Sequence, residues 1–72
     1  MPTSAARESR RYRDELMQNL IDTQNRLWDA HARFNQATQP ELIEQCVYEI
    51  NAWKARHAYF MRLLREIEEE SA

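Results

Sequence analysis

The sequence predicts an all-α fold, an antiparallel two-helix hairpin that resembles a short coiled coil. Three observations support this: the 72 residues contain no glycine, 31% of them are charged, and the apolar side chains recur with heptad spacing. A chain without glycine lacks the usual residue of tight β-turns, and heptad spacing is typical of helices that pack along their length. At this length the chain has room for one domain.

The first helix is expected at about residues 7–35, after a flexible lead at residues 1–6. Thr3 or Ser4 is suited to cap its start, because a hydroxyl accepts a hydrogen bond from a free backbone amide. The apolar or small positions of this helix are spaced alternately by four and three residues, which defines a seam. This seam consists of Leu16, Leu20, Thr23, Leu27, Ala30 and Phe34.

A turn is expected at residues 36–39, where the apolar pattern is interrupted. Pro40 disfavours helical geometry at the residue before it, so the first helix must end ahead of it. Two starts of a second helix fit the sequence. Thr38 and Glu41 match a capping box, and alternatively Gln39 caps a helix that begins with Pro40.

The second helix is expected at about residues 40–69 and carries a second, uninterrupted seam. A short turn makes the two helices antiparallel, so the two seams should face each other layer by layer. The second seam consists of Ile43, Cys46, Ile50, Trp53, His57, Phe60, Leu64 and Ile67. The expected layers pair Phe34 with Ile43, Ala30 with Cys46, Leu27 with Ile50, Thr23 with Trp53, Leu20 with His57, and Leu16 with Phe60.

Arginines gather near the start of the first helix and glutamates near the end of the second. The register above places Arg7 across from Glu70 and Arg11 across from Glu66, so these charges are expected to select the register. The alternative is a basic arm that binds phosphates. The two groups are Arg7, Arg10, Arg11 and Arg13, and Glu66, Glu68, Glu69 and Glu70.

The sequence contains no motif for catalysis, a cofactor or a metal ion. GxSxG, a glycine-rich phosphate loop, CxxC, HxxH and HExxH are all absent. His31 and Cys46 form a zinc-compatible pair, but a structural zinc site needs about four ligands. We therefore expect no enzyme, no cofactor and no metal site. A single cysteine and apolar stretches broken by charge predict a cytoplasmic protein without a membrane span.

Polar and aromatic residues at and beside the seams point to a further interface. His57 interrupts an apolar seam, which fits an imidazole hydrogen-bonded within an interface or, alternatively, a pH-sensing group. Aromatic and methionine side chains just outside a seam are typical of a second contact surface. The candidate interface residues are Met17, Ile21, Trp28, Tyr48 and Met61.

A two-helix layer leaves one side of each seam open to water, so we expect two hairpins to dimerise into a four-helix bundle. The predicted function is that of a small interaction or adaptor module. Its expected partner is a second copy or an unidentified protein, not a membrane. The alternative is a nucleic-acid-associated accessory protein that uses the N-terminal arginine cluster.

The stretch from Trp28 to Glu66 resembles the YaaL-like family of small bacterial proteins, a domain of unknown function found chiefly in Firmicutes. The resemblance implies a bacterial, cytosolic helical protein without an assigned activity, and it implies no catalytic residue. Gln39 and His57 stand where the family more often has an aspartate and an aromatic residue. The resemblance is carried by Phe34-Asn35, Thr38 to Ile43, Tyr48-Glu49, Ala52, Arg56, Tyr59 and Leu63 to Glu66.

Overall fold

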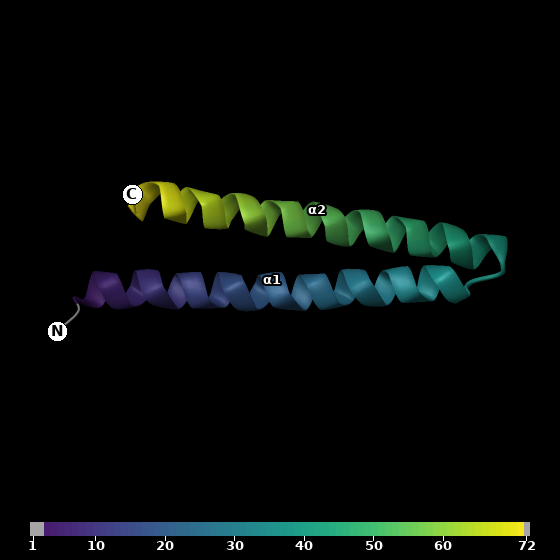
Figure 1. Ribbon diagram of the computed structural model, residues 1–72, viewed down its shortest axis with the longest axis horizontal. Coiled ribbons are helices and arrows are strands. Elements are labelled where there is room, and N and C mark those ends of the chain that lie inside the picture. Colours follow the sequence, from purple (N-terminus) through teal and green to yellow (C-terminus); the bar gives the residue numbers. More distant parts are fainter. Residues whose placement is uncertain (1–2, 72) are drawn as a thin grey trace.

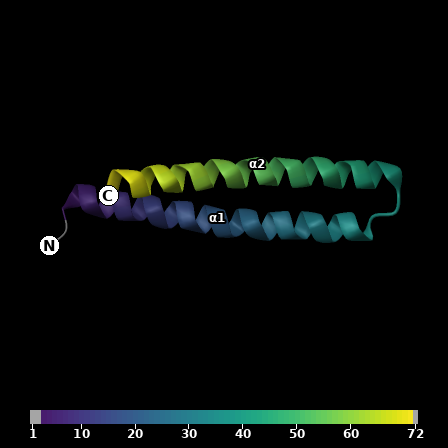
Figure 2. The same cartoon turned by 45° about the horizontal axis from the view of Figure 1, so that its top comes forward.

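The computed structural model describes residues 3–71, which form two antiparallel helices (Figure 1). Helix α1 spans Ser4–Gln36 and helix α2 spans Pro40–Ser71. The helices run side by side in both views, so the two termini lie at one end of the molecule and the link lies at the other (Figure 2). The predicted all-α hairpin is confirmed. Met1 and Pro2 of the expected lead lie outside the described residues.

Thr3 caps the start of α1. Its side-chain oxygen accepts a hydrogen bond from the N–H of Ala6 at 3.1 Å, and its backbone carbonyl accepts one from Arg7 at 3.0 Å. The capping role expected of Thr3 is therefore observed, and it lets the helix begin at Ser4 rather than near Arg7. Ser4–Ala6 belong to the helix and not to a flexible lead, because the cap satisfies amides of this first turn.

The link between the helices is short and begins with extended backbone. Ala37 ends α1 with φ −72° and ψ 134°, and its N–H donates to the carbonyls of Arg33 and Phe34. α2 begins at Pro40. Proline has no backbone N–H, but the first residue of a helix does not need one, because its N–H has no partner within the helix. The backbone carbonyl of Gln39 accepts from the fourth residue of α2 at 3.0 Å. Of the two starts that fit the sequence, the one with Gln39 before Pro40 is observed.

The core is one row of side chains between the helices. Thr23 is buried in this row, and its hydroxyl donates to the carbonyl of Asn19 at 2.7 Å, so the polar group is satisfied. The molecule measures 57 × 19 × 13 Å and is therefore one helix layer thick. Both broad faces of the row remain open in a single layer. The buried apolar residues are Leu16, Leu20, Ala30, Cys46 and Ile50.

The hairpin register differs from the expected one by about one helical turn. The guanidinium of Arg26 lies 6.0 Å from the centre of the Trp53 ring, and the side chain of Gln24 lies 3.5 Å from that of His57. The expected layers place Thr23 at Trp53 and Leu20 at His57. Because each observed contact lies three or four residues further along α1, the predicted layers are displaced by one step of the seam.

The link explains this displacement. Its extended backbone carries the chain past the end of α1 before α2 begins, so that the start of α2 projects beyond α1 (Figure 1). Phe34, which the heptad spacing places in the seam, is 38% exposed. The expected pair of Arg11 with Glu66 is not formed, and Glu66 lies 3.9 Å from Arg62 within α2 instead.

Candidate functional site

Apolar side chains gather on one of the two broad faces of the hairpin. Helix geometry places the residue that directly follows each seam position on the same side of both antiparallel helices. On this side α1 carries Met17, Ile21 and Trp28, and α2 carries Val47 and Met61. We call these five residues the Trp28 face.

Every residue of the Trp28 face is exposed. Trp28 is 77% exposed, Ile21 47% and Met17 41%. Trp28 also lines an open depression of about 230 Å³ together with His31 and Asn35. Large apolar side chains grouped on one exposed face are typical of a surface that contacts a partner.

Tyr48 is separated from the other expected interface residues. It lies two positions from both Cys46 and Ile50, which are buried, so the rotation of about 100° per residue directs it to the outer side of α2. Its exposed fraction is 67%. Val47 was missed by sequence reasoning, although it directly follows a seam residue, as Met61 does.

The opposite face carries arginines packed on aromatic rings. The guanidinium groups of Arg26 and Arg56 lie 6.0 and 5.9 Å from the centre of the Trp53 ring, and Arg56 lies 6.0 Å from that of Phe60. We call Arg26, Arg33 and Arg56, together with the rings of Trp53 and Phe60, the arginine face. Cation–π contacts stabilise by about 0.5–1 kcal/mol each at exposed sites. Trp53 is therefore half-buried and covered within the hairpin, in contrast to Trp28.

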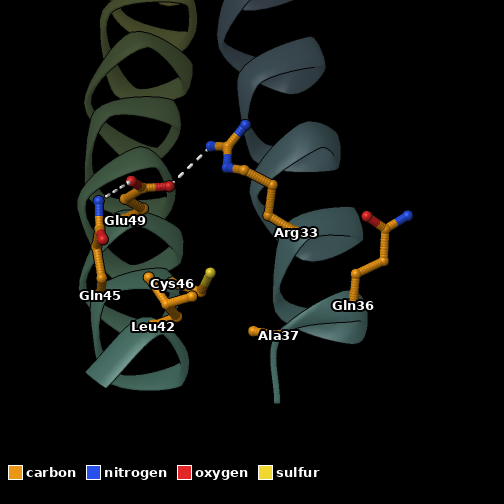
Figure 3. A pocket seen from close by; sticks show the side chains of 7 residues that line it. All are labelled: Arg33, Gln36, Ala37, Leu42, Gln45, Cys46 and Glu49. Atoms are coloured by element: carbon orange, nitrogen blue, oxygen red, sulfur yellow. Dashed lines mark hydrogen bonds and ion pairs between the residues drawn. The ribbon is translucent and has the colours of Figure 1, made fainter. Parts of the chain in front are cut away.

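An ion pair joins the helices near the link on the arginine face. Nη2 of Arg33 donates to Oε2 of Glu49 at 2.7 Å, and the amide of Gln45 donates to the other carboxylate oxygen at 3.2 Å (Figure 3). The hydrogen bond from Arg33 lowers the pKa of the Glu49 carboxyl below its ordinary value of 4.5, and it raises the pKa of the guanidinium. These side chains line a depression of about 260 Å³, together with Leu42 and Cys46.

His57 is half-buried in the seam, between the two faces. Its Nε2 lies 3.5 Å from Nε2 of Gln24, at the outer limit of a hydrogen bond. His31 and Cys46 line two different depressions. Residues 3–71 contain no group of three side chains that could hold a metal ion.

The N-terminal arginines project from α1 without the expected partners. Arg7, Arg10, Arg11 and Arg13 are all exposed. None of them forms an ion pair with another residue in the described part of the chain. At about 100° per residue they spread over nearly half the circumference of α1, so they do not form one compact patch.

No family model, no curated protein and no solved structure matches this chain. The resemblance to the YaaL-like family therefore stays a prediction. Over residues 3–71, neither helix has a stretch that is long and apolar enough to cross a membrane.

Proposed function

We propose that this chain is a small, non-enzymatic interaction module that binds other helical surfaces through the Trp28 face. The observation that supports this most strongly is the indole of Trp28, which is 77% exposed on the same face as the exposed side chains of Met17 and Ile21. Apolar residues spaced by three and four positions on a helix are the usual anchors in helix-to-helix recognition.

The small core of the hairpin supports the same proposal. Within residues 3–71 five apolar side chains are buried, and ten large hydrophobic or aromatic residues are exposed. A stable domain ordinarily packs two layers of secondary structure around its core. A second helical layer on the Trp28 face supplies the missing layer.

The arginine face is less suited to this role. Its aromatic rings are already in contact with Arg26 and Arg56, and its ion pair between Arg33 and Glu49 is made within the hairpin. A helix that docked there would have to displace charged groups from their partners. Within residues 3–71, the one such contact between the helices beside the Trp28 face is that of Gln24 with His57.

Affinity capture from the native host tests the proposal with two matched variants. Ile21→Glu introduces a charge on the Trp28 face at a residue that is 47% exposed. Tyr59→Glu is the control, because Tyr59 is 49% exposed and lies off this face. We expect proteins, including further copies of the chain, to be retained by the wild type and the control and lost with Ile21→Glu. Equal retention by all three folded proteins would contradict the proposal.

A nucleic-acid-associated role is a second candidate, because the four N-terminal arginines have no ion-pair partner among the described residues. Unpaired arginines remain available for phosphates, and binding that depends on them falls steeply with salt. A titration of duplex and single-stranded DNA at low salt tests this role. If the chain does not bind DNA at low salt, the nucleic-acid-associated role is excluded.

A further inference from the structure

We infer that the partner of the Trp28 face is a second copy of this chain, related by a two-fold axis that runs along the hairpin. In this dimer α1 of each copy packs against α2 of the other. The inference rests on the proposed function and adds the identity of the partner and the geometry of the complex.

The size of the face fits this partner. The described part of the hairpin is 57 Å long and 19 Å wide, so one broad face offers on the order of 1,000 Å². Each partner in a stable protein complex commonly buries about 800 Å². A second hairpin of the same dimensions covers the whole face, whereas a single short helix would leave part of the apolar row uncovered.

The apolar residues of the two helices are matched level by level. The contact of Arg26 with Trp53, and the depression that Tyr12 and Ile67 line together, show which residues of α1 and α2 lie at the same height. A two-fold axis along the hairpin preserves these heights in the second copy. In the inferred dimer, Met17 of one copy therefore faces Met61 of the other, and Ile21 faces Ala58. Trp28 faces Asn51 of the other copy, and Val47 of that copy lies one helical turn from Asn51.

The charges at the ends of the same rows are also complementary. The same heights bring Asp14 to Arg65 and Arg10 to Glu68 of the second copy. None of these four side chains takes part in an ion pair within the described hairpin. Opposite charges at the edge of an apolar interface fix orientation and register, although each pair adds little affinity.

The other two-fold arrangement fits less well. An axis across the hairpin, centred so that Met17 meets Trp28 of the second copy, packs α2 against α2. The register used above, with Arg26 level with Trp53, then places Val47 opposite Glu66 and Lys54 opposite Tyr59. Val47 would face a charge and Lys54 would gain no acidic partner, which disfavours this orientation.

Disulfide trapping distinguishes these arrangements. Cys46→Ala removes the native thiol. In this background, one chain carries Met17→Cys and a second chain, of different mass, carries Met61→Cys. We expect the mixed pair to crosslink under mild oxidation, because bridged cysteines need Cα atoms within about 7 Å. The matched pair of Met17→Cys and Trp28→Cys should not crosslink, since these positions lie at different heights.

The outcomes separate this inference from the proposed function. Crosslinking of Met17→Cys with Trp28→Cys instead would overturn the geometry, and so would a two-chain mass without either crosslink. A folded protein with the mass of one chain would overturn the inference as a whole. The interaction module would then still stand if host proteins are captured by the wild type and lost with Ile21→Glu, and it would fail together with the dimer if nothing is captured.

Discussion

The two tryptophans of this hairpin have opposite surroundings. Trp53 lies on the arginine face, half-buried and flanked by Arg26 and Arg56 from the two helices. Trp28 lies on the other face and is 77% exposed. Trp53 occupies a seam position and Trp28 the position directly after one, so only Trp53 is covered by its own chain.

This difference separates stability from recognition. The ion pair of Arg33 with Glu49 and the packing of Arg26 on Trp53 join α1 to α2 on the arginine face. The Trp28 face contributes little to holding the two helices together, so its apolar residues are free to pack against another surface. We therefore expect substitutions on the two faces to affect different properties.

The largest effect is expected from Trp28→Ala, which tests the recognition side of this comparison. Loss of a central aromatic anchor commonly costs about 2–4 kcal/mol of binding, so the dissociation constant of the dimer should rise by about 30-fold or more. The free energy of unfolding of the separated chain should hardly change, because the indole is exposed. Sedimentation across a dilution series and chemical unfolding measure the two quantities. A Trp28→Ala variant that dimerises as tightly as the wild type would contradict the assignment of recognition to the Trp28 face.

Trp53→Ala is the matched substitution on the arginine face. It removes a half-buried ring and its contacts with Arg26 and Arg56, so the free energy of unfolding should fall by about 2 kcal/mol. At protein concentrations where the hairpin stays folded, the affinity of the dimer should be unaffected. An unchanged unfolding midpoint, or a loss of dimer equal to that of Trp28→Ala, would contradict this assignment.

His57→Leu tests a residue of the seam, which lies between the two faces. The imidazole makes only a 3.5 Å contact with Gln24, so a leucine that fills the same space should stabilise the hairpin by about 0.5–1 kcal/mol. The same variant tests the pH-sensing hypothesis. Assembly measured at about pH 5.5 and about pH 7.5, a range in which histidine usually changes charge, should differ between variant and wild type if His57 is a sensor. Identical profiles remove that role.

The smallest effect is expected for Glu49→Gln on the arginine face. The pKa of Glu49 is lowered in the folded chain, so the pair with Arg33 stabilises at pH values above the ordinary carboxyl value of 4.5. This contribution is lost as the pH falls below 4.5 through the lowered pKa. The variant should be slightly less stable than the wild type near neutral pH and equally stable in acid. Thermal unfolding at several pH values measures this, and a constant difference at every pH would contradict it.

The helices and their antiparallel order were predictable because heptad spacing and a short turn before Pro40 determine them. The register was not predictable, because the apolar rows of the two helices still face each other when α2 is moved by one step of the seam. The conformation of Ala37 decides between the two registers, and heptad spacing does not specify it. The pairs of Arg7 with Glu70 and Arg11 with Glu66 depended on that register and failed with it.

The candidate site was predicted in part. Met17, Ile21, Trp28, Tyr48 and Met61 are predicted because they are large apolar or aromatic residues just outside a seam, but position outside a seam does not tell which side of the helix a residue occupies, and Tyr48 lies on the outer side of α2. The arginine face was not foreseen. Its contacts depend on side chains that reach across the hairpin, and the expected register placed those side chains about one turn away from their partners.

Sedimentation equilibrium of the wild-type chain at micromolar concentration tests the central claim most directly. The account predicts a mass of about twice the 8.7 kDa of one chain, and a return to 8.7 kDa when Ile21 is replaced by glutamate. A wild-type chain that sediments at 8.7 kDa while circular dichroism shows both helices fully formed would contradict it.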